Sequence, residues 1–368
     1  MNPVINNTLE NDNNTFTFTL SGVNVSLANA LRRTIIADIP TVVFKTAPYE
    51  QNKAVIFKNT SRLNNEILKQ RLSCIPIHIT DEKLPLENYL LEVNIENTTD
   101  TMQYVTTEHF KIKNITTDEF LTKKDNDKIF PPDPFTGYYI DFVRLRPKIT
   151  DEIPGEKLHF TCEFSYGTCK EDAMFNTSSA CSYGMTCDTV NSKIELGKKK
   201  QLWKNENLSE EDIIFKSKDW ELLDAARIVI KDSFDFTIQS VGVFTNQDLI
   251  QKAITIIINK LQEIENTIDS GDLDITVSEN TMKNCFDIKL KNEDYTIGKI
   301  LEYALHFKYY QELKTITYCG FVKLHPHDND SIIRIAYKEL PEKPLIYQNL
   351  KECIHNLITA FQIIFDKF

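Results

Sequence analysis

The feature that most constrains the fold is an alternating strand followed by an amphipathic helix at residues 15–40, a combination that returns near the end of the chain. Residues 16–20 alternate apolar and polar side chains, which is typical of a half-buried strand. Ser26 is a candidate N-cap for the helix, and Pro40 blocks its continuation. The residues that recur at helical spacing are Leu27, Ala30, Leu31, Thr34 and Ile35.

The other side of this helix carries two adjacent arginines, Arg32 and Arg33. On pattern alone we favour a core helix whose arginines are solvated, because the charged face of an amphipathic helix usually meets water. The alternative is a docking face for another protein. Spacing by itself leaves both interpretations open.

Length and charge limit the functions that this chain can have. With 368 residues we expect two or three domains. The net charge of −11 argues against a protein that grips nucleic-acid phosphates on its own, because such proteins need a basic face. An acidic subunit of a larger nucleic-acid machine remains compatible with it. The sequence shows neither a secretory signal nor an apolar run of membrane-spanning length, so we expect a soluble, intracellular protein.

The middle of the chain is less regular than its ends. Residues 1–14 are Asn-rich and predict a frayed lead-in. A second amphipathic helix is predicted within 59–77, and short strands alternate with polar loops over 80–215. Residues 190–220 are interpreted as a charged connector.

A second strand and helix follow at 234–268. The helix from Gln247 has a wide apolar face, more than one sheet usually needs, which predicts a second packing partner. After a polar linker, strand–helix patterning starts again. Its predicted segments are strands at 285–290, 318–322 and 331–337, and helices at 292–307 and 345–365.

No catalytic constellation is evident. The chain lacks any Gly-x-Gly, which argues against phosphate-binding loops. Asp232 and Asp235 do not form the convergent cluster that a two-metal site needs, and Asp235 fits the outward position of a strand. His325 and His327 flank a proline, and we favour a surface turn over a metal site.

The cysteines offer a zinc site as an alternative. The four candidates, Cys162, Cys169, Cys181 and Cys187, are spaced more widely than the ligand loops of structural zinc sites. We therefore expect free thiols, no metal and no cofactor.

Several segments together resemble the α-like subunits of RNA polymerases: bacterial α, archaeal D and the third-largest subunit of RNA polymerase II. The helix at 24–40 is similar to the first helix of that family. The further matching positions are Glu66, Arg71, Leu72, Ile75, Pro76, Gly167, Lys170, Ala173, Phe175, Ser240, Val241 and Gly242.

The end of the chain resembles the small α-like partner, the eleventh subunit of RNA polymerase II and archaeal L. The matching positions are Asn292, Glu293, Asp294, Thr296, Gly298, Leu301, Gly320, Phe321, His325 and Pro326. The two resemblances imply a fusion of large and small α-like subunits, an arrangement that points to a large DNA virus as the source.

The resemblance implies an α+β fold: two α-like dimerisation modules, with mixed or antiparallel sheets and helices on one side, plus a mainly β insert. The expected parts are a flexible N-terminus (1–14), a discontinuous large module (15–47 and 218–268), the insert (48–217), a linker (269–280) and a small module (281–368). Residues expected to join the modules are Leu27, Leu31, Ile35, Leu249, Ile254, Ile257, Leu261, Leu301, Leu350, Ile354, Leu357 and Phe361.

The implied function is a non-catalytic assembly platform within a multisubunit DNA-directed RNA polymerase. Its expected partners are the second-largest (β-like), largest (β′-like) and small subunits, with DNA and RNA reached only through the complex, no membrane and no homodimer. Localisation follows as virion and host cytoplasm for a viral enzyme, and otherwise the nucleus. The alternative is a stand-alone interaction or scaffold protein with α-like folds, and an independently acting enzyme ranks third. The residues expected to dock the other subunits are Asn29, Arg32, Arg33, Lys170 and Phe175.

Overall fold

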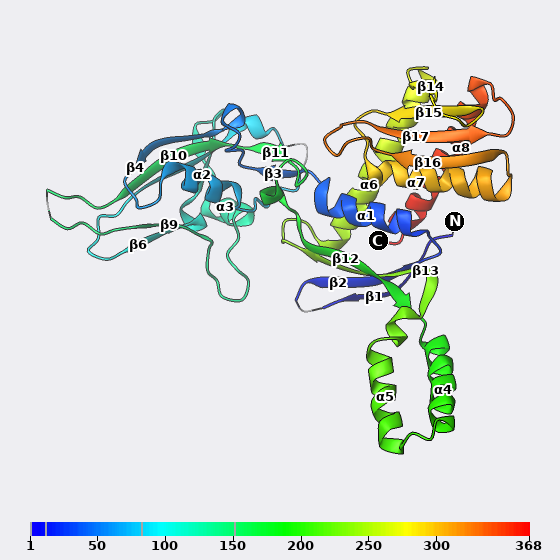
Figure 1. The fold of residues 1–368 in the computed structure, drawn as a ribbon. Coiled ribbons are helices and arrows are strands. Elements are labelled where there is room, and N and C mark those ends of the chain that lie inside the picture. The colour runs from blue at the N-terminus through cyan, green and yellow to red at the C-terminus, as the bar shows by residue number, and fades with distance from the viewer. Residues whose placement is uncertain (1, 12, 82–83, 151) are drawn as a thin grey trace. The chain divides into compact units, whose positions relative to one another are not determined.

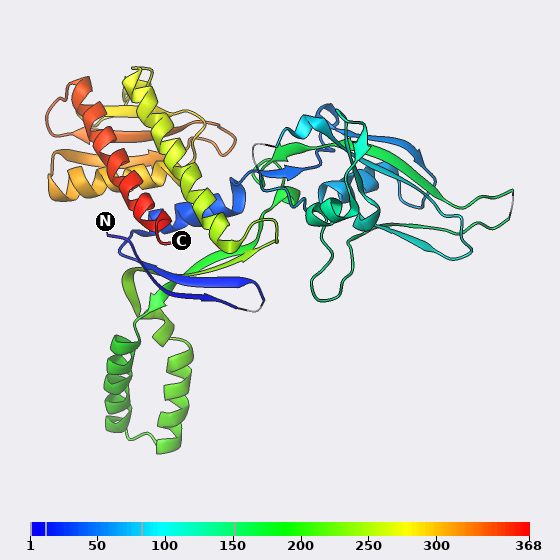
Figure 2. The same ribbon diagram turned by 180° about the vertical axis from the view of Figure 1, so that it is seen from behind.

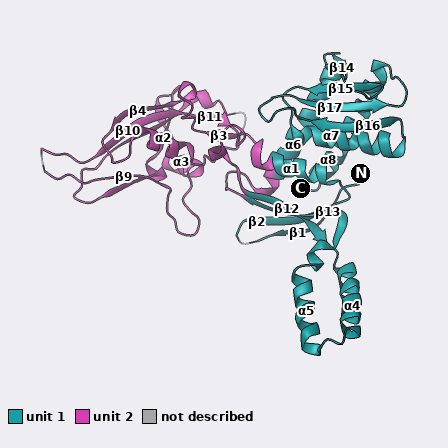
Figure 3. Cartoon of the chain, in the orientation of Figure 1, with its two compact units in different colours: residues 1–34, 180–239, 250–368 teal, residues 35–179, 240–249 magenta. Residues whose placement is uncertain are grey.

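The computed structural model describes residues 2–11, 13–81, 84–150 and 152–368. The chain forms two compact units (Figure 3). Unit 1 contains residues 1–34, 180–239 and 250–368, and unit 2 contains residues 35–179 and 240–249. The expected insert, 48–217, differs from unit 2, because residues 180–187 continue a strand that joins the sheet of unit 1.

The first part of unit 1 is a four-stranded sheet with the order β1-β2-β13-β12. Strand β13 pairs antiparallel with β2, and Phe18 stacks on its register partner Phe236 with ring centroids 5.0 Å apart. Alternation places the phenylalanines of both strands on one buried face. The elements are β1 (Val4–Glu10), β2 (Thr15–Ser21), α1 (Val25–Ala37), β12 (Ser178–Cys187), β13 (Val229–Ser240) and α6 (Asn246–Asp269).

The N-terminal residues differ from the expected frayed lead-in. Val4–Glu10 forms β1, which pairs antiparallel with β2 from Val4 opposite Ser21 to Glu10 opposite Phe16. Its side chains are mostly exposed, so the main-chain ladder rather than apolar burial holds this edge strand.

The second part of unit 1 is another four-stranded sheet, with the order β14-β15-β17-β16. Helices α6 and α8 lie across this sheet (Figure 2), although α6 follows a strand of the first sheet. The elements are β14 (Ile275–Val277), β15 (Cys285–Leu290), α7 (Tyr295–Leu305), a π-helical turn (His306–Glu312), β16 (Ile316–Val322), β17 (Ser331–Tyr337) and α8 (Lys343–Phe365).

Residues 189–222, which span the expected connector (190–220), form a helical hairpin instead. Helix α4 (Thr189–Asn205) and helix α5 (Glu210–Leu222) extend away from the first sheet between β12 and β13 (Figure 1). Leu196, Ile213 and Trp220 are the buried apolar residues of the pair.

Unit 2 is mainly β, with a five-stranded sheet in the order β4-β10-β5-β7-β8 and two short ribbons, β6–β9 and β3–β11. Its strands are β3 (Thr41–Val43), β4 (Ala54–Asn59), β5 (Tyr89–Glu96), β6 (Gln103–Thr106), β7 (Lys111–Asn114), β8 (Glu119–Phe120), β9 (Asp141–Leu145), β10 (Lys157–Glu163) and β11 (Ser165–Gly167). Its α-helices are α2 (Asn65–Ser73) and α3 (Lys123–Ile129). Short 3-10 turns are Tyr49–Gln51, Leu86–Asn88, Thr107–His109, Ala173–Phe175 and, in unit 1, Ala225–Arg227.

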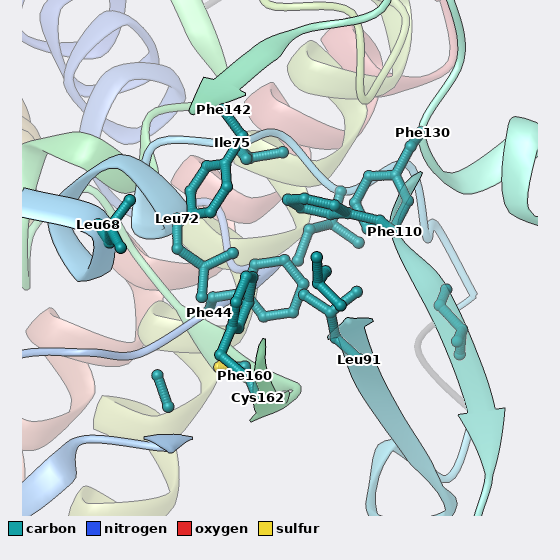
Figure 4. Close-up of a cluster of buried hydrophobic side chains, with 14 of the residues drawn as sticks. Phe44, Leu68, Leu72, Ile75, Leu91, Phe110, Phe130, Phe142, Phe160 and Cys162 are labelled. Atoms are coloured by element: carbon teal, nitrogen blue, oxygen red, sulfur yellow. The ribbon is translucent and has the colours of Figure 1, made fainter. Parts of the chain in front are cut away.

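The core of unit 2 is built around aromatic rings (Figure 4). Phe110 makes edge-to-face contacts with Phe130 and Phe142, at centroid distances of 5.4 and 5.5 Å. Leu68 and Leu72 close this core from helix α2. Aromatic pairs of this kind stabilise beyond their buried area, so unit 2 has a core of its own.

The architecture confirms the expected α+β class. Its sheets carry antiparallel pairs, and helices lie against them. None of the helices in the described residues is long and apolar enough to cross a lipid bilayer.

Candidate functional site: a contact between two related helices

Helices α1 and α7 begin in the same way, which makes the two parts of unit 1 comparable. Residues 24–31 read Asn-Val-Ser-Leu-Ala-Asn-Ala-Leu, and residues 294–301 read Asp-Tyr-Thr-Ile-Gly-Lys-Ile-Leu. Asn24 Oδ1 accepts the backbone N–H of Ser26 at 2.9 Å, and Asp294 Oδ1 accepts that of Thr296 at 2.8 Å. The N-cap expected at Ser26 is therefore two residues too late, because Asn24 satisfies the first turn.

Arg33, in the second half of α1, connects this helix to the start of α7. From α1 its Nε donates to Thr296 Oγ1 at 2.9 Å, and its Nη2 donates to Asp294 Oδ2 at 3.1 Å. Asp294 thus uses one carboxylate oxygen as the cap of α7 and the other as the acceptor for Arg33. Because both side chains are partly exposed, at 38% and 23%, solvent screening limits this ion pair to at most about 1 kcal/mol of stability.

Further contacts connect the two parts of unit 1 away from Arg33. The ring of Phe368, the last residue, lies 5.9 Å from Phe16 and 5.0 Å from Phe18 on β2. Lys351 of α8 pairs with Asp269 at the end of α6. These contacts connect the middle of α8 and the residues just after it to elements of the first part.

The apolar residues expected to join two modules are all buried. Each is at most 1% exposed: Leu27, Leu31, Ile35, Leu249, Ile254, Ile257, Leu261, Leu301, Leu350, Ile354, Leu357 and Phe361. Ile35 and Leu249 belong to unit 2 and the others to unit 1. At about 25 cal/mol per Å² of apolar area, such burial contributes far more than the Arg33 ion pair.

The expected docking residues fall into two groups. Within α1, Arg32 donates from Nε and Nη2 to Asn29 Oδ1 at 3.1 and 3.0 Å, so these two side chains form one polar group on the helix. In unit 2, Lys170 is exposed, whereas Phe175 is 5% exposed and packs over Gly167. Its contact in this structure is therefore internal.

Sequence reasoning missed the roles of Asp294, Thr296 and Phe368. Asp294 and Thr296 were noted only as positions of a resemblance, and the complementary charge of Arg33 was a signal that could have paired them. Phe368 stands outside the apolar stripe of α8, so periodicity gave no indication of its contact with β2.

The other candidate chemical groups are held in structural contacts. Asp235 accepts hydroxyl hydrogen bonds from Thr19 and Thr186, at 2.7 and 2.9 Å. On the second sheet, Arg334 donates twice to Asp287, at 2.6 and 2.7 Å, and thereby lowers the pKa of that carboxyl group.

The histidines and cysteines of the metal alternatives have ordinary surroundings. His325 and His327 lie in an exposed turn. Burial raises the pKa of the Cys181 thiol to about 12, and it also raises that of Cys162, so both stay protonated near neutral pH. Among the described residues, no group of three or more His, Cys, Asp and Glu side chains is arranged to hold a metal ion.

Comparison with known families identifies the strand–helix arrangement. The RNA polymerase Rpb3/Rpb11 dimerisation domain matches residues 17–261, from β2 into α6. The chain belongs to this family. The match to this Rpb3/Rpb11 family ends before β14. The second sheet and α8 therefore lie outside the matched residues.

Several proteins similar to this chain are RNA polymerase subunits by name. The chain is 25% identical to the DNA-directed RNA polymerases I and III subunit rpac1 of Dictyostelium discoideum, over 72% of this chain and 81% of that protein. It is 24% identical to the bovine subunit RPAC1, over 72% and 84%, and 23% identical to subunit Rpo3 of Pyrococcus horikoshii, over 71% and 96%.

Proposed function

We propose that this chain is a non-catalytic assembly subunit of a multisubunit DNA-directed RNA polymerase. In it, residues 275–368 act as the small partner of the Rpb3/Rpb11-family module that precedes them. The observation that carries the proposal is the bonding of Arg33 to both Asp294 and Thr296. It connects α1 to the start of α7, and these two helices begin with the same sequence pattern.

Apolar burial supports an obligate pairing of the two modules. Helices α6 and α8 each bury a continuous stripe of apolar side chains. Exposing either stripe to water would greatly reduce the stability of the fold. Because both modules share one chain, their association is intramolecular, with an effective concentration of order mM across a short linker. The proposal therefore includes no homodimer.

The proposed docking group for the β-like subunit is Arg32 with Asn29, since Arg33 is occupied within the chain. Lys170 adds an exposed cation in unit 2. Phe175 would support that loop from inside, because it is buried. The β′-like and small subunits complete the proposed complex, through which DNA and RNA are reached.

The source and location belong to the same proposal. A fusion of the two module types fits a large DNA virus, which would place the complex in the virion and host cytoplasm, whereas a cellular enzyme of this type would be nuclear. A tagged purification from the native source tests this, with template-dependent RNA synthesis as the readout. Recovery of the chain alone and inert would favour the stand-alone scaffold instead.

Charge reversal tests the docking group. We expect Arg32→Glu to abolish co-purification of the large subunits while the thermal unfolding of the isolated chain is unchanged within about 0.5 kcal/mol, as for other surface substitutions. Arg227→Glu is the matched control, because the Arg227 side chain is 82% exposed and lies beside the hairpin. If Arg32→Glu assembles as well as the control, the docking assignment is wrong.

A further inference from the structure

Half of the arginines in this acidic chain line one pocket of unit 2. The pocket has a volume of about 500 Å³. Its arginines come from the loop before α2, from α2 itself, from β9 and from the residues just after β9: Arg62, Arg71, Arg144 and Arg146. Such a concentration of guanidinium groups in a chain of net charge −11 indicates a site for negatively charged groups.

Two of these arginines have their positions fixed by the fold. Arg71 donates from Nε to the carbonyl of Phe142 and from Nη2 to that of Asp141, both at 2.8 Å, which ties α2 to β9. Arg146 pairs with Glu156 at 2.5 Å, and Glu156 is 8% exposed. These contacts build the walls of the pocket.

The other two arginines keep their charge available. Arg144 lies over the ring of Tyr104, 4.9 Å from its centroid, a contact that orients the guanidinium without neutralising it. Neither Arg62 nor Arg144 has a carboxylate within ion-pair distance among the described residues. Both are exposed at the surface.

The lining between these cations is apolar. Leu63, Met102, Phe142 and Val143 contribute to it, and Phe142 belongs to the aromatic core of unit 2. A ligand that fits this chemistry carries carboxylates for the rim and an apolar side chain for the interior. Carboxylates also match the planar, bidentate geometry of guanidinium groups.

A nucleic-acid strand fits these observations less well. Phosphate backbones are bound along extended basic surfaces, whereas these four arginines gather around one pocket, with Asp141 in its lining and Glu156 behind Arg146.

We propose that this pocket binds a short acidic segment of another protein, with its carboxylates on Arg62 and Arg144 and one apolar side chain over Leu63 and Met102. This goes beyond the polymerase role and does not depend on it. The site recognises a peptide of this chemistry whether or not the Arg32 face docks a large subunit.

Fluorescence anisotropy on the purified full chain tests the proposal. The probes are labelled short peptides of Glu, Asp and a single Leu or Phe, the same peptides with Gln and Asn in place of the acids, and single-stranded oligouridine. We expect the acidic peptides to bind, with an affinity that falls as salt rises. The amide peptides should bind at least about tenfold more weakly, a difference of about 1.4 kcal/mol.

Variants assign that binding to the pocket. The double variant Arg62→Glu with Arg144→Glu should reduce the affinity for acidic peptides by about tenfold or more, and the neutral pair Arg62→Gln with Arg144→Gln should reduce it by less. Arg227→Glu, which reverses a single charge elsewhere, should bind as the unaltered chain does. The Gln pair also keeps the test valid should charge reversal disturb folding.

Three results would overturn the proposal: no binding of any acidic peptide, equal binding by the Gln pair and the unaltered chain, or binding of oligouridine in preference to the peptides. None of these depends on co-purification with polymerase subunits, so failure here is distinguishable from failure of the polymerase role.

Discussion

The two helix starts of unit 1 are alike in their buried positions and different in their polar ones. Residues 24–31 and 294–301 share a side-chain cap and an apolar stripe that includes Leu27 and Leu31 in one, Ile297 and Leu301 in the other. The first helix presents arginines, and the second presents the carboxylate that accepts one of them. The comparison teaches that apolar faces hold these modules together, whereas polar positions distinguish one from the other.

The largest expected effect comes from shortening a buried side chain in helix α8, which covers the second sheet (Figure 2). Leu357→Ala in α8 should reduce the free energy of unfolding by about 2–5 kcal/mol, because it removes buried methyl groups and leaves a cavity. Urea denaturation followed by circular dichroism measures this. Ile363→Ala in the same helix, at a position 36% exposed, should cost much less. Equal losses would mean that α8 is not buried as described.

The next effect sharpens the comparison at one matched position, where α1 has Ala28 and α7 has Gly298. A Cβ at Gly298 would lie 1.9 Å from Cε2 of Phe321, so Gly298→Ala should destabilise by about 1–3 kcal/mol through overpacking. Adding Phe321→Leu should recover part of the loss. Gly197→Ala in exposed helix α4, where nothing lies within 4 Å, should instead stabilise by about 0.5–1 kcal/mol. Stabilisation by both substitutions would refute the close packing.

A pH-dependent effect tests the contribution of the Asp287 carboxylate, on the second sheet, to the stability of the fold. Arg334 lowers the pKa of Asp287 in the folded chain, so the ionised carboxylate stabilises the fold above the ordinary aspartate pKa of about 3.9. That contribution is lost as the pH falls from there through the lower folded-state pKa. The stability difference between the unaltered chain and Asp287→Asn should therefore shrink on acidification. A difference that stays constant from neutral pH to pH 3 would contradict this.

The smallest effect is the coupling between the two polar positions. A double-mutant cycle of Arg33→Met and Asp294→Asn should give about 0.2–1 kcal/mol, reduced by salt, since Asn preserves the cap of α7. The matched cycle with Arg32→Met should give none, because the Arg32 guanidinium contacts Asn29. Coupling of equal size in both cycles would mean that Asp294 does not interact specifically with Arg33.

Periodicity predicted the elements that bury one face. The strand at β13 and the helices α1, α6 and α8 were all found from alternation or helical spacing, because burial imposes those patterns. The hairpin α4–α5 was missed because it buries only three apolar residues and leaves others, such as Ile194 and Phe215, exposed. Strand β1 was missed for a related reason, since its backbone rather than its side chains holds it.

The site was only partly predictable. Asn24 and Ser26 are both good capping residues, so sequence could not decide between them. Nor could it decide which of two adjacent arginines would turn inward, because the acceptor of Arg33 lies 261 residues away along the chain. Phe175 was expected at a docking surface from resemblance alone, and its burial follows from the close approach that Gly167 permits.

The pairing of β2 with β13 has a consequence for how the protein is made. Thr19 and Asp235, bonded across these strands, are 216 residues apart, and residues 35–179 of unit 2 and the hairpin are translated between them. At the usual rates of synthesis, β2 leaves the ribosome roughly 10–40 s before its central neighbour exists. During that interval β2 lacks its pairing partner β13, so both its unpaired edge and its phenylalanine face are open to association with other chains.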